Sequence, residues 1–303
     1  MQHQGVAVPT TGALRGFLRV LTSQLVWWAR FCRRKPLGAF GLFVVLFMIF
    51  AAIAAPILQT HDPFDQNYLD ALQGPRLSHW FGTDDYGRDL YSRVVHGARI
   101  SVTVAFVSVF IGTSLGMLIG LVSAYTGGWV DSAIQRLIEI KQAIPSLVLA
   151  ILLVAVFSAG IDKVIIALSI TFIPGTVRVV RGTVLQVKSL TYVEAARAIG
   201  ARPWRIMLRH IAPNVFAPYL IVASTLLSTA VLVEASLAYL GLSVPPPAPS
   251  WGRMLQSGAQ LYALTAPHLV IIPGLAIALL VLAFNLFGDA LRDVLDPRLR
   301  GGR

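Results

Sequence analysis

The amino-acid sequence predicts an all-α integral membrane protein with six transmembrane helices. Hydrophobic residues make up 56% of the 303 positions, and the mean hydropathy is +0.71. Charged residues make up only 13%, whereas soluble proteins carry about 25%. Long uncharged runs separate the charged segments, and about 20 consecutive apolar residues are enough to cross a bilayer as a helix.

The basic residues are concentrated in three segments. The chain has 25 Lys and Arg and a formal net charge of +11, and six of these residues fall in 1–36, seven in 178–209 and four in 292–303. Basic clusters beside membrane helices mark the cytoplasmic face. No basic segment is interleaved with a platform on which nucleic-acid bases could stack. We therefore expect contact with membrane lipid, no nucleic-acid partner, and both termini in the cytoplasm.

The hydropathy pattern divides the chain into segments. Residues 1–36 are expected to form a cytoplasmic amphipathic and basic segment, and 37–58 the first transmembrane anchor. An extracytoplasmic loop is expected over 59–99, a transmembrane core over 100–288 and a cytoplasmic tail over 289–303. Within the core, further spans are predicted at about 100–124, 143–160, 164–181, 215–240 and 268–288.

A polar, basic insert follows the fourth predicted span. Thr191 and Glu194 fit a capping box that begins a helix, and Gly200 suits the left-handed residue that closes one. Pro203 fits the first turn of a second helix, which Pro213 is expected to end. The insert is therefore predicted to form two short helices joined at a glycine corner. From this predicted geometry alone, the insert is equally well interpreted as a linker or as an element that docks on a partner.

Several motifs of the insert and of the flanking chain resemble those of ABC importer permeases. Glu194-Ala195-Ala196 followed by Gly200 resembles the EAA loop of that family, which places the loop at 191–213. His210 and Ala212 depart from the general ending of this loop, and the stretch RHIAPN resembles instead the variant of the dipeptide/oligopeptide branch. Further motifs, between about residues 36 and 300, are similar to the DppC/OppC-like subunit of this branch: FGTDDYGRD (81–89), GARIS (97–101), EASL (234–237), PSWG (249–252), NLFGD (285–289) and LDPRLRG (295–301).

This resemblance implies the type I ABC importer permease fold, with the EAA loop as a cytoplasmic coupling helix seated on an ATPase. The family positions of this coupling element are Glu194, Ala195, Ala196 and Gly200. Arg202 and Arg205 are added on chemical grounds, as candidate ion-pair partners rather than family positions.

The resemblance also implies the partners and the location of the chain. The partners are a homologous second permease subunit, two ATPase subunits that hold ATP and Mg, and an extracytoplasmic solute-binding protein. The location is the bacterial cytoplasmic (inner) membrane. The chain would form half of a translocation pathway for peptides or a related small solute.

The residues themselves indicate neither an enzyme nor a cofactor on this chain. A phosphate-binding P-loop needs Gly-Lys-Ser/Thr, whereas the four lysines follow Arg, Ile, Asp and Val. The six histidines are scattered along the sequence and Cys32 is the single cysteine, so we expect no catalytic site and no metal-ligand cluster.

Glu234 is the one serious candidate for a carboxyl group inside a predicted span. An ion-coupled secondary transporter needs such groups near the membrane midplane. This alternative and a non-transporting membrane scaffold therefore stay open from the residues alone. Glu234 is either a pathway or gate residue, or lies near the outer interface and bonds the backbone or Arg253.

The stretch 81–99 carries charges of both signs. They form either a structural set of ion pairs at the outer face or a docking surface for a binding protein, and the sequence does not separate the two. The residues are Asp84, Asp85, Arg88, Asp89, Arg93 and Arg99.

Overall fold

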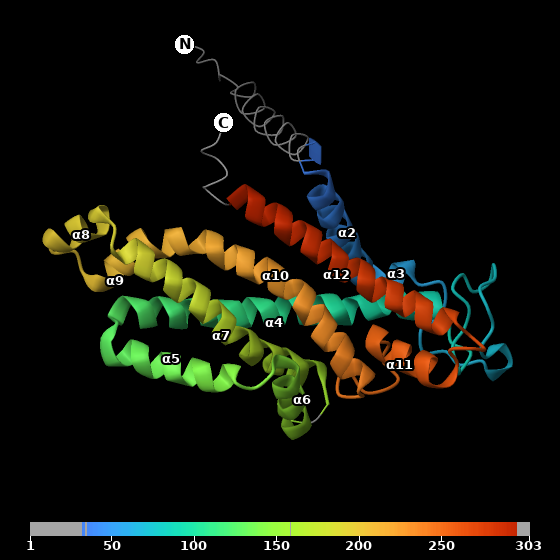
Figure 1. Ribbon diagram of the computed structural model, residues 1–303. Helices are drawn as coiled ribbons and strands as arrows, with labels where there is room; N and C mark the ends of the chain where they lie inside the picture. Colours follow the sequence, from blue (N-terminus) through green and yellow to red (C-terminus); the bar gives the residue numbers. More distant parts are fainter. Residues whose placement is uncertain (1–31, 34, 158, 296–303) are drawn as a thin grey trace, which may run out of the picture.

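The structure is a computed structural model that describes residues 32–33, 35–157 and 159–295, and every regular element in these ranges is helical (Figure 1). The amphipathic helix expected within 1–36 lies outside the described residues, which begin in this segment with Cys32, Arg33, Lys35 and Pro36, and so does the end of the tail from 296. The elements are α2 (Pro36–Ile53), α3 (Ala55–Leu58), η1 (Tyr68–Asp70), α4 (Leu90–Thr126), α5 (Gly128–Gln142), α6 (Ser146–Phe157), α7 (Ile161–Lys188), α8 (Thr191–Ala198), α9 (Pro203–Ile206), the π-helical turn η2 (Met207–Ile211), α10 (Ala212–Tyr239), α11 (Trp251–Leu261) and α12 (His268–Leu295).

Five continuous helical runs are long and apolar enough to cross a membrane. They are α2, α4, α7, α12 and the run Pro203–Tyr239, which joins α9, η2 and α10. A sixth crossing is available if α5 and α6, which meet at an angle of 87°, form one bent span. The all-α, multi-span architecture predicted from hydropathy is confirmed.

The third span, predicted over about 143–160, is shorter in the structure. The structure breaks the chain at Ala143–Pro145, because a proline disfavours helical geometry in the residue before it. α6 has 12 residues, a length of about 18 Å at 1.5 Å per residue, which is short of the bilayer core of about 30 Å. A full crossing here therefore needs the more polar α5 as well.

Helix α4 begins ten residues before the span predicted at 100. Its N-cap is Asp89, whose side chain accepts a hydrogen bond from the backbone N–H of Ser92 at 2.8 Å. Residues 90–99, expected in an outer loop, are thus the first turns of a long helix.

Small residues bring the central helices into close contact. Gly112, Gly116 and Gly120 lie on the face of α4 that packs against α7, and a Cβ added at Gly116 would lie 2.7 Å from the Cβ of Thr176. Such spacing of small residues lets membrane helices approach closely without a strong apolar driving force between them. The first and last described long helices also pack together: Gly38 of α2 meets Ala290 of α12.

The bundle has two distinct ends (Figure 1). At one end, α8 and α9 turn away from the long helices, and we call this the corner end. At the other end, the loop 59–89 lies beside α11, and we call this the loop end. The chemically distinctive side chains gather at these two ends.

Candidate functional sites at the two ends of the bundle

The corner consists of α8, the Gly200 turn and α9. Gly200 has φ +79°, the left-handed conformation predicted for it, and the N–H of Ala201 donates to the carbonyl of Ala196 at 3.0 Å across the turn. Pro203 occupies the first turn of α9, also as predicted. The sequence therefore fixes a sharp reversal of direction between two short helices.

Two details of the corner differ from the sequence prediction. The capping box is wrong: Leu190 is the N-cap of α8, Thr191 is already helical, and the N–H of Glu194 donates to the Leu190 carbonyl at 3.2 Å. Pro213 does not end the second helix. It lies in the first turn of α10, directly after η2, where its missing N–H breaks no established helical bond.

A small apolar core holds the corner on the long helices. Val193 and Ala196 of α8 and Ile206 of α9 are buried in one cluster with Val180 and Val184 of α7. The corner therefore cannot rotate freely on its linker, since any movement of it must displace α7.

A polar clamp also fastens α8 to the beginning of α10. The side-chain amide of Asn214 donates to the Tyr192 hydroxyl at 3.1 Å and to the His210 carbonyl at 2.7 Å. The Tyr192 hydroxyl donates to the same carbonyl at 3.3 Å. His210 and Asn214 belong to the RHIAPN stretch, so this stretch has a structural task in the corner that its sequence alone did not indicate.

The corner presents a surface hollow of about 940 Å³. Of the residues predicted to couple to an ATPase, five line it: Ala195, Ala196, Gly200, Arg202 and Arg205. Glu194 is exposed on α8 but does not line the hollow. In the described part of the chain, no ion pair includes Glu194, Arg202 or Arg205. Their charges are therefore available to another molecule.

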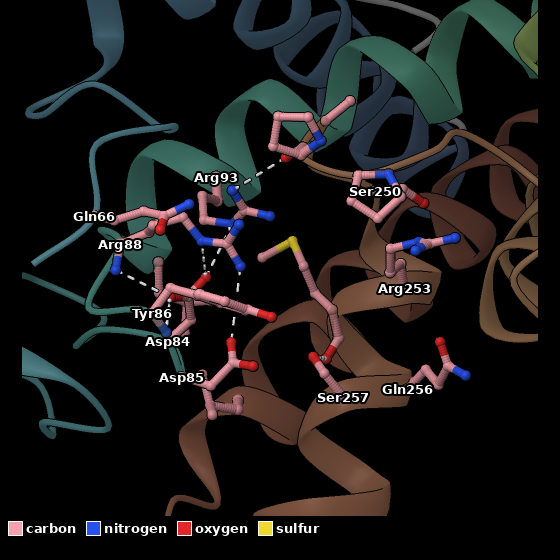
Figure 2. A pocket seen from close by; sticks show the side chains of 16 residues that line it. Gln66, Asp84, Asp85, Tyr86, Arg88, Arg93, Ser250, Arg253, Gln256 and Ser257 are labelled. Atoms are coloured by element: carbon pink, nitrogen blue, oxygen red, sulfur yellow. Dashed lines mark hydrogen bonds and ion pairs between the residues drawn. The ribbon is translucent and has the colours of Figure 1, made fainter. Parts of the chain in front are cut away.

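At the loop end, a cavity of about 450 Å³ lies between the stretch 84–93 and α11. Asp84, 6% exposed, accepts hydrogen bonds at one oxygen from the backbone N–H groups of Tyr86 and Arg88, both at 2.9 Å. Its other oxygen lies 2.7 Å from Nε of Arg88 and 3.3 Å from Nε of Arg93. Figure 2 shows these charges on one side of the cavity, facing Arg253, Gln256 and Ser257 of α11.

The charges of the stretch 81–99 are thus at least partly structural. Arg93 is buried and donates to the Pro63 carbonyl at 2.8 Å, which ties the outer loop to α4. Burial, together with repulsion from the neighbouring Asp84 carboxylate, raises the pKa of Asp85 above its ordinary value.

Arg253 differs from the other two arginines of this cavity, because no ion pair among the described residues includes it, whereas Arg88 and Arg93 both pair with Asp84. Its Nη2 donates only a long 3.4 Å hydrogen bond to the Gly241 carbonyl, and its buried Nε, like that of Arg93, has no hydrogen-bond partner among the described residues. A guanidinium that is neither exposed nor fully paired favours an anionic group in the cavity.

Glu234 lies in α10 behind this cavity and is fully buried. The hydroxyl groups of Ser101 and Ser243 donate to its two carboxyl oxygens at 3.1 and 3.2 Å. The partner suggested from the sequence, Arg253, is wrong, because that side chain turns towards Gly241. Glu234 therefore joins α10 to α4 and to the loop after α10.

The histidines are scattered along the sequence, but the fold brings two of them together. His61 and His79, distant in the sequence, meet at Asp89 beside the start of α4. Only the folding of the 59–89 loop brings them together, so no local motif could have revealed the cluster.

Known protein families match both the N-terminal part and the larger remaining part of this chain. Residues 112–301 match the family described as "Binding-protein-dependent transport system inner membrane component", and residues 23–75 match the "N-terminal TM domain of oligopeptide transport permease C". The chain is 42% identical over 277 residues to the "Glutathione transport system permease protein GsiD" of Pectobacterium atrosepticum, covering 90% of this chain and 91% of that one. It is 44% identical over 279 residues to GsiD of Escherichia coli, covering 91% and 90%.

The fold resembles a solved transporter. A chain of the MetNI methionine ABC transporter, solved in inward-facing conformations, superposes with a TM-score of 0.56 at 22% identity, covering 67% of this chain and 96% of that chain. A second crystal form gives a TM-score of 0.57 at 21% identity, covering 68% and 98%. The matched part is the type I ABC permease architecture. The chain therefore belongs to the binding-protein-dependent transport system inner membrane components, and it is a multi-pass permease subunit of an ABC importer whose ATPase activity lies in separate subunits.

Proposed function

We propose that the corner is the coupling element of this permease, and that it docks into a groove of a partner ATPase through Glu194, Ala195, Ala196, Gly200, Arg202 and Arg205. The observation that carries the proposal is the contrast between its two faces. The inner face is fixed to α7 by buried apolar side chains, whereas the outer face exposes unpaired charges around a hollow. When a partner displaces such an element, the element and α7 move together and the element keeps its shape.

The remaining partners follow from this role. We infer a homologous second permease subunit that completes the pathway, two ATPase subunits that hold ATP and Mg, and a solute-binding protein at the loop end. This arrangement places the corner and both termini in the cytoplasm of a bacterium and the loop end outside the inner membrane, in keeping with the basic segments at 178–209 and 292–303.

The solute that we propose is a small peptide-like molecule with a carboxylate, such as glutathione. Two relatives that match over about nine-tenths of the chain are named for glutathione transport. The incompletely paired Arg253, which lines the cavity at the loop end, is suited to such a group.

ATP-driven closure of the ATPase pair would move the corner, and α7 and α10 would carry that movement to the loop end. Alternating access follows, because the long helices turn the pathway from one side of the membrane to the other. A loaded binding protein would then release its solute into the opened pathway.

The test uses cells that express the complete transport system and a double variant, Glu194→Ala with Gly200→Val. Valine strains the left-handed turn, and removal of Glu194 deletes an exposed charge. We expect the variant to reach the membrane at the normal level, to lose most co-purifying ATPase subunit, and to take up radiolabelled glutathione at least tenfold more slowly. Glu139→Ala, which removes another exposed glutamate on α5, is the matched control.

Normal ATPase co-purification with the double variant would contradict the coupling proposal. Absence of glutathione uptake in the wild type would instead contradict only the choice of solute, because co-purification does not depend on it.

A further inference from the structure

Three potential metal ligands from separate parts of the outer loop converge at the loop end. His61 follows α3, His79 lies in the loop before α4, and Asp89 is the N-cap of α4. One ligand atom from each residue lies within 4.8 Å of the others. Oδ1 of Asp89 is 2.9 Å from Nδ1 of His79 and 3.8 Å from Nδ1 of His61. The two rings lie side by side, with centroids 4.5 Å apart.

Asp89 is a buried carboxylate, 2% exposed, whose only ion-pair partners in the described part of the chain are the two histidines. Asp84, by contrast, is neutralised by two arginines. A buried carboxylate without a permanent cation is costly unless another positive group joins it. The imidazoles need a proton to supply that charge, whereas a divalent metal supplies it directly.

The second oxygen of Asp89 is already fully engaged. Oδ2 accepts from the Ser92 N–H at 2.8 Å, from the Ser92 hydroxyl at 2.6 Å and from the Thr60 hydroxyl at 3.2 Å. The carboxylate is therefore held in one orientation, with Oδ1 turned to the histidines, as a metal ligand with supporting outer-shell bonds is.

We propose that His61, His79 and Asp89 bind a divalent transition-metal ion of the zinc class. Zinc bonds of about 2.0–2.2 Å in a tetrahedral site separate neighbouring ligand atoms by about 3.3 Å. The two distances to Oδ1, 2.9 and 3.8 Å, lie on either side of this value. Calcium and magnesium prefer oxygen ligands, so a set of two imidazoles and one carboxylate selects zinc and its neighbours.

The site has an open side. The His61 side chain is 43% exposed, which leaves access for the ion and a fourth position for water. Nδ1 of His61 lies 3.1 Å from the Thr60 hydroxyl, a contact that a bound ion would replace. A bound ion joins the segment after α3, the His79 loop and the start of α4, so it stabilises the loop end of the permease.

The test uses the full chain, purified in detergent with a tag that contains no histidine and stripped with a chelator. Titration with zinc chloride in a calorimeter measures stoichiometry, and cobalt substitution reports tetrahedral coordination by its visible absorption. We expect His61→Ala to bind one metal equivalent fewer than the wild type and to lose the tetrahedral cobalt spectrum. Zinc raises the melting temperature of the wild type by linkage, and this rise disappears in His61→Ala.

The matched control is His96→Ala, which removes a histidine of α4 that pairs with Gln59 outside the cluster. We expect this variant to bind zinc as the wild type does. Because His61 is largely at the surface, its replacement leaves the fold intact, and an unchanged melting temperature without metal verifies this. Equal zinc stoichiometry in His61→Ala and the wild type, or no binding by the wild type, overturns the proposal.

Discussion

At the scale of single residues, Glu234 shows how a polar group is accommodated inside this bundle. Both of its oxygens accept from serine hydroxyls, Ser101 on α4 and Ser243 after α10. The three residues are all buried, so each hydroxyl depends on the carboxyl group for its partner. This mutual dependence, rather than an ion pair, explains why the side chain is tolerated in a membrane helix.

Replacement of Glu234 tests this arrangement. Glu234→Ala leaves two buried hydroxyls without their acceptor and opens a cavity, so we expect a loss of about 2–4 kcal/mol in the free energy of unfolding. Glu234→Gln keeps the volume and one carbonyl acceptor, and it should lose clearly less. Thermal unfolding of the two variants in detergent measures the difference. Equal melting temperatures for both variants and the wild type would show that Glu234 does not hold α4 and α10 together.

Glu234 and Asp89 also show which properties of single residues cannot be predicted from the sequence. The hydropathy pattern singled out Glu234 because it lies in an apolar run, but the identity of its partners depends on how α4 meets α10. His61, His79 and Asp89 lie in a polar loop where their residue types are unremarkable. Their significance arises only when the loop folds back on the start of α4.

At the scale of helices, the α4–α7 contact depends on three glycines spaced four residues apart. Gly112, Gly116 and Gly120 each meet the backbone or a β-carbon of α7, whereas Gly182 of α7 has open space around it. The same substitution, glycine to alanine, should therefore have different effects at positions that are equivalent by sequence alone.

We expect Gly116→Ala to destabilise the permease by about 1–3 kcal/mol, because its new methyl group overlaps Thr176 and α7 must shift. Gly182→Ala, the matched control, should leave stability unchanged or raise it slightly, since alanine is the better helix former. Melting temperatures of the two variants, measured side by side in one detergent, provide the check. A Gly116→Ala protein as stable as Gly182→Ala would mean that α4 and α7 do not pack as closely as the structure has them.

The helix scale also separates what hydropathy can predict from what it cannot. Long uncharged runs correctly indicated α2, α4, α7, α10 and α12. A span was also predicted over about 143–160, but α6 has only 12 residues and meets α5 at 87°, because the length of an apolar run does not reveal where the chain bends. Pro213 was misjudged for a related reason: a proline ends a helix only where its N–H is required, and the preceding π-helical turn carries the chain into α10.

At the scale of the whole molecule, α10 connects the corner end to the side of the bundle where α11 lies (Figure 1). α7 ends directly before α8, and α10 continues from the corner to Glu234 and the turn that leads to α11. The 28 residues of α10 extend about 42 Å at 1.5 Å per residue. A displacement of the corner therefore reaches the cavity beside Arg253 through continuous helices, which is the geometry that a coupled permease requires.

This connection has a function only if the two ends lie on opposite sides of the membrane, and cysteine labelling can test that. Cys32 is the single cysteine, so Cys32→Ser provides a cysteine-free background. Into it we would introduce Leu264→Cys at the loop end or Ile199→Cys at the corner, positions whose side chains are 99% and 85% exposed. In spheroplasts, a membrane-impermeant maleimide should label Leu264→Cys at once and Ile199→Cys only after permeabilisation.

Both positions are highly exposed, so they should react to a similar extent once the membrane is opened, and a difference before that step reports sidedness rather than burial. Labelling of Ile199→Cys in sealed spheroplasts would place the corner outside the cell. A coupling element there could not meet an ATPase supplied with cytoplasmic ATP, so this single result would refute the proposed role of the corner while leaving the fold itself unaffected.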